Sequence, residues 1–210
     1  AAARAGLDLR TAHELVNRVD TELEAELPYA FDSRLGYLTA CPTNVGTGMR
    51  ASVMLHLPAL VLTEQIKQVM NAVTKIQLAV RGLYGEGTEA LGNLFQVSNQ
   101  HTLGETEAEL ISRIEGVAEH IVQAELNARE KLLHENPLML HDQVGRAYAT
   151  LRFAHILSSK EALNHLSLLR LGADMDIVQG CDRSVLDILL LEIQPAHLQF
   201  AAGRDLSAEE

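Results

Sequence analysis

The chain has 210 residues, of which 47% are hydrophobic and 21% charged, and its formal net charge is −11. This length permits one or two domains with a sizeable core, and the acidic balance argues against a nucleic-acid surface, because phosphate backbones are bound by clustered Lys and Arg. Two cysteines are too few for a disulfide framework, and the sequence shows no secretory leader and no apolar run of 18 residues, so we expect a reduced, cytoplasmic compartment.

The first half of the chain alternates helices and short strands. Asp8 can cap a helix whose apolar residues follow helical spacing and which ends before Pro28. Further along the chain we expect strands at residues 35–40, 77–83 and 93–98 and a helix at residues 63–75. Strands joined by helices or loops, with no regular βαβ repeat, predict an α+β fold with a mostly antiparallel sheet backed by helices.

The second half of the chain is predicted to be helical. Thr106 and Glu109 form a capping-box pattern that opens a long amphipathic helix reaching about Leu133. After Pro137, helices are predicted at residues 139–157, 159–171 and 183–192. Because the composition changes from mixed to all-helical near Arg129, we expect a catalytic domain at residues 1–128 and a helical domain at residues 129–210.

The stretch from Cys41 to Met54, CPTNVGTGMRASVM, is the hardest to explain by folding alone. Gly46 and Gly48 mark a loop, and glycine allows backbone amides to approach a ligand closely. After the loop, side chains should alternate, with Arg50, Ser52, Met54 and His56 on one face and Ala51, Val53, Leu55 and Leu57 on the apolar face. A glycine loop that leads into an arginine suits an anionic group such as phosphate, although a plain turn has the same composition.

A second unusual stretch, VRGLYGEGTEALGNLFQVSNQ, covers residues 80–100 and places Arg81 and Glu86 beside two glycines. Two arginines for an anion and a carboxylate for a cationic group suit phosphoryl transfer, which depends on positioning and charge neutralisation.

With these two stretches, the sequence resembles the phosphagen kinases, which move the γ-phosphoryl group of ATP onto a guanidinium nitrogen. The segments LGYLTACPTNVGTGMRASV and VRGLYGEGTEALGNLFQVSNQ carry the resemblance, which covers essentially the whole chain. The segment LHLPALVLTEQI and the helical tail resemble one branch in particular, the bacterial protein-arginine kinases of the McsB type.

The resemblance assigns roles to individual residues. Cys41 would polarise the acceptor guanidinium as a thiolate, and Glu86 would align it and accept its proton. The nucleotide-contacting positions would be Arg50, Ala51, Ser52, Val53, Met54, Arg81, Gly82, Leu83, Tyr84, Gly85 and Glu86. A nearby arginine would lower the pKa of the Cys41 thiol, although without the resemblance an ordinary buried thiol is the better interpretation. The arginines could equally be surface ion-pair partners, and Glu89 competes with Glu86.

No side-chain metal site is predicted. The nine histidines show no ligand spacing with cysteine, and Mg²⁺ normally arrives on nucleotide phosphates with water. The expected cofactors are therefore ATP and Mg²⁺ carried by the nucleotide.

The family pattern also includes an upstream segment with a second catalytic carboxylate and further ATP-binding arginines, and a phosphoarginine-sensing motif past Glu210. Neither occurs here, so we expect a fragment truncated at both ends and inactive alone. The resemblance implies a kinase of protein arginines that marks proteins for a Clp-type protease during stress, with a zinc-finger activator as partner and possible self-association. The alternatives are a kinase of free arginine or another small guanidino compound, and a non-catalytic phosphoarginine-binding adaptor.

Overall fold

The computed structural model describes residues 6–82 and 90–204, and these form two compact units. The sheet unit comprises the described residues of Ala1–Leu55, Lys67–Arg81 and Phe95–Gln123. The helical unit comprises those of His56–Ile66, Gly82–Leu94 and Ala124–Glu210. The two units are not divided at a single point of the sequence, and the predicted domain boundary near Arg129 stays a prediction.

The sheet unit is built on a three-stranded sheet in the order β3-β5-β4. The strands are β3 (Ser52–His56), β4 (Leu78–Gly82) and β5 (Leu94–Asn99), preceded by a small antiparallel pair, β1 (Phe31–Asp32) and β2 (Gly36–Tyr37). Asn99 bonds to Ala51 and Leu57 bonds to Asn93, so β3 and β5 run antiparallel. This confirms an α+β fold with an antiparallel sheet pair, although the predicted strand at residues 35–40 is reduced to two residues.

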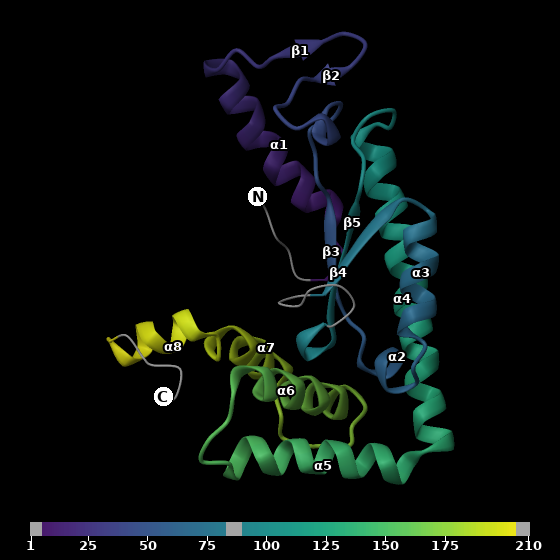
Figure 1. Ribbon diagram of the computed structural model, residues 1–210, viewed down its shortest axis with the longest axis vertical. Helices are drawn as coiled ribbons and strands as arrows, with labels where there is room; N and C mark the ends of the chain where they lie inside the picture. The colour runs from purple at the N-terminus through teal and green to yellow at the C-terminus, as the bar shows by residue number, and fades with distance from the viewer. Residues whose placement is uncertain (1–5, 83–89, 205–210) are drawn as a thin grey trace. The chain divides into compact units, whose positions relative to one another are not determined.

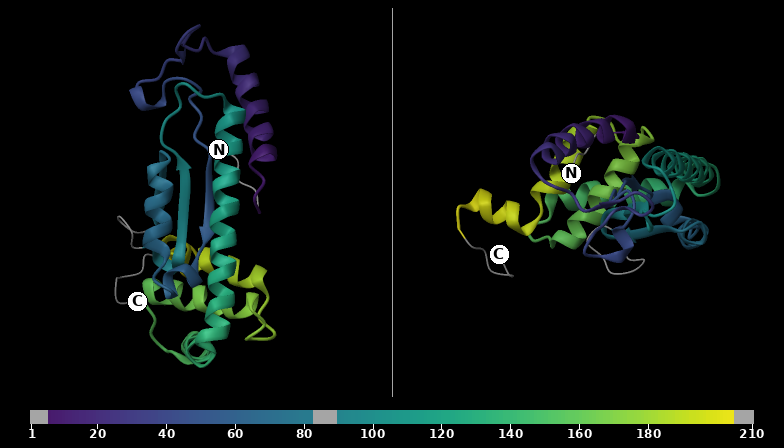
Figure 2. Two further views of the ribbon diagram at one scale, coloured as in Figure 1. Left: turned by 90° about the vertical axis from the view of Figure 1, so that its right-hand side faces the viewer. Right: turned by 90° about the horizontal axis from the view of Figure 1, so that it is seen from above.

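One face of this sheet is covered by helices. Figures 1 and 2 show α3 (Ile66–Lys75) and the first part of α4 (Glu107–Glu135) on the same side of the strands. The side chains that pack there are buried and apolar; they are Ala51, Val53, Leu55, Met70, Val73, Leu78, Val97, Leu110, Ile111, Ile114 and Ala118. Burial of this face confirms the predicted alternation of β3 and leaves Arg50 and Met54 exposed on the other face.

Helix α1 (Leu9–Glu26) begins and ends as predicted, with Asp8 Oδ1 accepting a hydrogen bond from the Thr11 amide. Its apolar stripe, however, is not buried: the exposed fractions of Leu15, Val16 and Val19 are 38%, 40% and 57%. The helix is held to α4 by polar pairs instead, with Arg10 donating to Glu115 at 3.0 Å.

The helical unit contains the last part of α4 and the remaining helices. They are α2 (Pro58–Leu62), α5 (Pro137–Phe153), α6 (Ser159–Asp174), α7 (Arg183–Glu192) and α8 (Pro195–Ala202), together with a 3₁₀ turn, η2 (Leu91–Asn93). Helix α6 packs on α5 and α7 through buried leucines that include Leu166, Leu169 and Leu186 (Figure 1). The tail is thus helical as predicted, and the bounds of α7 agree residue for residue, but α5 ends at Phe153 rather than at residue 157, and α8 was not predicted.

The predicted helix at residues 63–75 is wrong at its start. Glu64 has a φ of 58°, so the chain breaks there and α3 begins at Ile66, while residues before the break form the unpredicted α2. A buried side chain explains α2: the Glu125 carboxylate accepts hydrogen bonds from the amides of Ala59 and Leu60 at 3.0 and 2.9 Å. A cap supplied from a distant helix leaves no local sequence signal.

The charge of Glu125 is balanced within the helical unit. Arg129 Nε donates to Glu125 Oε1 at 2.9 Å, and Arg129 Nη1 donates to Asp174 Oδ2 at 3.2 Å. We refer to Glu125, Arg129 and Asp174 with the two capped amides as the Glu125 network. Glu125 is only 4% exposed, so these bonds satisfy a carboxylate that would otherwise be costly to bury.

Within residues 6–82 and 90–204, no individual helix combines the length and apolar character that a membrane span needs. Helices α7 and α8, bent by 85° where they join, meet those criteria as a pair by length and composition.

Candidate phosphate-binding face

The face of β3 opposite the helices carries hydroxyl, amide and guanidinium groups. Arg50 Nη2 donates to Ser98 Oγ at 3.1 Å, and Gln96 Nε2 donates to Ser52 Oγ at 3.1 Å. One bond joins β3 to β5 and the other joins the residue two positions before β3 to β5, so together they form a continuous polar surface, which we call the polar face. Arg50 is exposed, and its guanidinium keeps donors available for a ligand.

Arg81 belongs to the same side of the sheet. Leu78 is fully buried in the core, and side chains alternate along a strand, so Arg81, three residues later in β4, lies on the face opposite the core. Only one strand, β5, separates β4 from β3 in the sheet order, so the two arginines belong to the same face of one three-stranded sheet. Two cations on one face suit a polyphosphate, which carries several anionic oxygens.

The start of β3 is fixed by Asn99, a residue that the sequence analysis missed. Its Nδ2 donates to the carbonyl oxygens of Met49 and His101, both at 3.0 Å, and its Oδ1 accepts from the Ala51 amide at 2.9 Å. Asn99 is buried, so all these bonds are shielded from water. The signal that could have identified Asn99 is its position directly after Ser98, at the end of the strand predicted at residues 93–98.

The loop before β3 is fixed by Thr102, which was also missed. Its hydroxyl lies within hydrogen-bonding distance of the carbonyl oxygens of Thr43 and Val45, at 3.1 and 2.8 Å, and its own carbonyl accepts from the Thr47 amide. Gly46 is required at this contact: its φ is 118°, and a Cβ there would collide with the Thr102 carbonyl. The predicted glycine loop is therefore held rigidly at the edge of the polar face, and its anchor comes from residue 102 rather than from a ligand.

Cys41 is exposed and begins a 3₁₀ turn, η1 (Pro42–Asn44). Its Sγ lies 3.0 Å from Thr43 Oγ, and the hydrogen bonds from the Thr43 hydroxyl and amide lower the pKa of the thiol. The interpretation as a buried thiol is wrong. The lowered pKa was expected from a nearby arginine, but among the described residues it comes from Thr43.

The other predicted nucleotide contacts divide into three groups. Ser52 and Met54 lie on the polar face, and Gly82 ends β4. Ala51 and Val53 point into the core, so their side chains serve packing, and both backbone groups of Ala51 are already bonded to Asn99. The positions Leu83, Tyr84, Gly85 and Glu86, and the competitor Glu89, lie outside the described residues.

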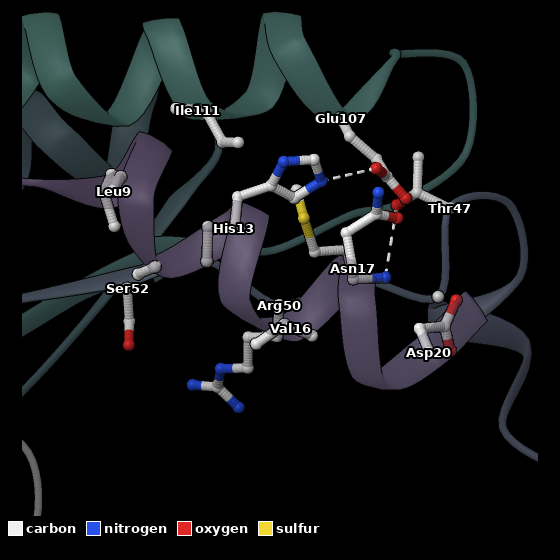
Figure 3. Close-up of a pocket in the computed structure, with 14 residues that line it drawn as sticks. Leu9, His13, Val16, Asn17, Asp20, Thr47, Arg50, Ser52, Glu107 and Ile111 are labelled. Atoms are coloured by element: carbon white, nitrogen blue, oxygen red, sulfur yellow. Dashed lines mark hydrogen bonds and ion pairs between the residues drawn. The ribbon is translucent and has the colours of Figure 1, made fainter. Parts of the chain in front are cut away.

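A cavity of about 350 Å³ adjoins the base of Arg50, between α1, the loop before β3 and the start of α4. Its polar wall is the pair formed by His13 and Glu107, whose Nε2 and Oε2 lie 2.7 Å apart. Figure 3 shows the Arg50 guanidinium directed away from this pair, on the side where the Ser52 hydroxyl lies. Arg50 and Ser52 are also among the lining residues, so the cavity adjoins the polar face, and the sequence analysis did not foresee it.

The described residues of the polar face fit a nucleotide triphosphate. Arg50 and Arg81 supply exposed cations, and Ser52 supplies a hydroxyl between strands. In the part of the chain that the structure describes, no group of three or more His, Cys, Asp or Glu side chains is arranged to hold a metal ion.

Two protein-family models match this chain, one in each half. Residues 1–128 match the model of the ATP:guanido phosphotransferase C-terminal catalytic domain. The chain belongs to this family, the phosphagen kinases, which confirms the resemblance on which the residue roles were based. Residues 137–210 match a second model, the protein-arginine kinase McsB C-terminal domain, which confirms the branch.

Curated relatives agree with both matches. The chain is 55% identical over 202 residues to the protein-arginine kinase of Moorella thermoacetica, covering 96% of this chain and 58% of that protein. It is 52% identical over 202 residues to the protein-arginine kinase of Pelotomaculum thermopropionicum (96% and 57%) and 49% identical over 205 residues to that of Bacillus cereus (98% and 58%). The chain therefore spans somewhat more than half the length of these relatives.

Among solved structures, a lombricine kinase is 31% identical, with a TM-score of 0.44 over 56% of this chain and 31% of that chain. A substrate-free duplicated taurocyamine kinase from Schistosoma mansoni is 22% identical, with a TM-score of 0.49 over 95% of this chain and 31% of that one.

Proposed function

We propose that this chain is part of a protein-arginine kinase that transfers the γ-phosphoryl group of ATP to arginine side chains of proteins. Membership of the ATP:guanido phosphotransferase family and relatives named protein-arginine kinase support this proposal. The observation that carries it is the polar face, where Arg50 and Arg81 lie on one side of the sheet, opposite the core.

In this proposal the polar face neutralises the triphosphate. Arg50 and Arg81 bind phosphate oxygens, and Ser98 holds the Arg50 guanidinium in place so that little reorganisation is needed when ATP binds. The Arg50, Ser52 and Met54 side chains line the nucleotide, while Ala51 and Val53 keep the strand in register. Further charge neutralisation for phosphoryl transfer would come from Mg²⁺ carried by the nucleotide.

The acceptor arginine lies at Cys41 in this proposal. A thiol with a lowered pKa supplies a thiolate that attracts and polarises the guanidinium, and Glu86 aligns the attacking nitrogen and accepts its proton. The transfer forms a P–N bond and breaks the bond between the γ-phosphorus and the β,γ-bridging oxygen, and ADP leaves.

The wider role is inferred from the same family. We propose a cytoplasmic enzyme whose phosphoarginine mark directs proteins to a Clp-type protease under stress, and which works with a zinc-finger activator and associates with itself. A net charge of −11 favours basic protein substrates by electrostatic steering.

Incubating a full-length protein that carries this chain with ATP and either free arginine or an arginine-rich protein tests the proposal. Acid-labile N-phosphorylation of the protein is expected. Label on free arginine alone would identify a kinase of small guanidino compounds, and nucleotide binding without label on either acceptor would identify a phosphoarginine-binding adaptor.

A further inference from the structure

A serine of the helical unit contacts the last residue of β3 and the turn before β5, both of which belong to the same unit. Ser167 lies on α6 and is 1% exposed. Its Oγ lies 2.8 Å from His56 Nε2 and accepts a hydrogen bond from Asn93 Nδ2, also at 2.8 Å. His56 is the last residue of β3, and Asn93 ends the turn η2 directly before β5. Ser167 therefore ties together two segments that are 37 residues apart in the sequence.

The same face of α6 holds the turn itself. Asn164 Oδ1 accepts a hydrogen bond from the Gly92 amide at 3.2 Å. Gly92 has a φ of 63°, and a Cβ at this position would lie 3.3 Å from the Leu163 carbonyl oxygen, so the turn approaches the helix backbone closely. The Leu57 amide donates to the Asn93 carbonyl at 2.9 Å and closes the link between the two segments.

The protonation state of His56 determines which groups donate and which accept hydrogen bonds in this link. Burial, followed by the positive charges of Arg170, Arg129 and Arg183, lowers the pKa of His56 to about 3, so the imidazole is neutral at physiological pH. Since Ser167 already accepts from Asn93, its hydroxyl proton is available to donate to Nε2 of the neutral ring. Asn93 then donates to Ser167, and Ser167 donates to His56, which forms a continuous chain of hydrogen bonds.

These contacts are unusual for a serine within a helix. A helical serine commonly faces solvent or bonds back to the carbonyl of the preceding turn. Ser167 instead contacts partners 111 and 74 residues away in the sequence. Buried polar links of this kind favour one arrangement of the elements they join, because separating Ser167 from His56 and Asn93 would leave more buried polar atoms unpaired than His56 Nδ1, which has no partner among the described residues.

We propose that Ser167 is a positioning residue for the phosphoryl transfer: it fixes the end of β3 and the turn before β5, and thereby the register of the strands that carry the phosphate-binding residues. The catalytic part of this proposal rests on the proposed function. Arg50 lies six residues before His56, and Glu86 lies seven residues before Asn93. Ser167 of the helical unit thus contributes to catalysis without touching nucleotide or acceptor.

The test compares three variants of a full-length protein carrying this chain. Ser167→Ala removes the link and is expected to lower kcat about tenfold, with KM for ATP unchanged within about twofold, because misplacement of reacting groups reduces rate more than binding. Ser167→Thr keeps the hydroxyl and should restore most of kcat. Ser159→Ala is the matched control, since its hydroxyl bonds to the Ile193 carbonyl at 3.2 Å on the same helix.

An unchanged kcat in Ser167→Ala, or an equal loss in Ser159→Ala, would overturn the proposal. If the unmodified protein phosphorylates no arginine, the proposed function fails together with the catalytic part of the inference. Hydrogen exchange at the Leu57 and Gly92 amides then decides the anchoring: faster exchange in Ser167→Ala than in Ser159→Ala supports it, and equal exchange rejects it.

Discussion

Charged side chains differ in exposure and in pairing between the polar face and the Glu125 network. On the polar face, Arg50 is exposed and, among the described residues, is bonded to the neutral hydroxyl of Ser98, so its charge remains available. In the Glu125 network, a carboxylate that is 4% exposed is satisfied by two amides and an arginine. An arginine that faces solvent among the hydroxyl and amide groups of the polar face fits a ligand site, whereas a fully paired buried charge indicates a structural role. Substitutions in each region should therefore affect different quantities.

Glu125→Ala is expected to have the largest effect, on stability. It leaves Arg129 Nε and the amides of Ala59 and Leu60 without their acceptor, and breaking a buried pair costs about 4 kcal/mol. Chemical unfolding measures the loss. Glu119→Ala, an exposed change on the same helix, should cost less than about 0.5 kcal/mol. Equal losses of unfolding free energy in Glu125→Ala and Glu119→Ala would contradict a structural role for Glu125.

Arg50→Ala should affect activity and leave stability nearly unchanged. Loss of a preorganised phosphate donor lowers kcat/KM about a hundredfold, which corresponds to about 2.7 kcal/mol, and the exposed side chain contributes little to folding. Steady-state kinetics and thermal unfolding of the full-length protein separate the two effects. Arg34→Ala, another exposed arginine of the sheet unit, is the control and should retain full activity. Activity that survives in Arg50→Ala would reject the polar face as the phosphate site.

His56 sharpens the comparison through pH. Its pKa is about 3 in the folded chain and about 6.5 when unfolded, so the unfolded state gains a proton first as the pH falls, and acid destabilises the fold. The expected loss between pH 7 and pH 5 is about 2 kcal/mol greater than in His56→Gln, measured by chemical unfolding at each pH. An identical pH dependence in the unmodified protein and in His56→Gln would show that the His56 imidazole is not held neutral by its surroundings.

The smallest expected effect concerns the N-terminal caps of α4, in the sheet unit, and α6, in the helical unit. Thr106 and Glu109 form a reciprocal capping box at α4, whereas at α6 the structure shows the bond from the Glu161 amide to Ser158 Oγ, at 3.3 Å. Thr106→Ala should cost about 1 kcal/mol in thermal unfolding, and Ser158→Ala about half of that. A larger loss from Ser158→Ala would contradict this ranking.

Local patterns in the sequence determined the element types and the faces of the strands. The capping pattern at Thr106 predicted the start of α4, and period-two alternation predicted which side chains of β3 would be buried. These features follow from interactions within a few residues, so a single chain read in order contains them. The two family-specific stretches likewise identified the family, which the matching models confirmed.

The tertiary structure alone decided which distant residues support the site. Ser98 holds Arg50 from 48 positions away, Thr102 anchors the glycine loop, and Glu125 creates α2 from another helix. The pKa of Cys41 depends on a threonine rather than an arginine, and the apolar stripe of α1 is exposed rather than buried. Each of these outcomes depends on partners that only folding brings together, because hydrogen bonding and burial are set by distance in space and not by distance along the chain.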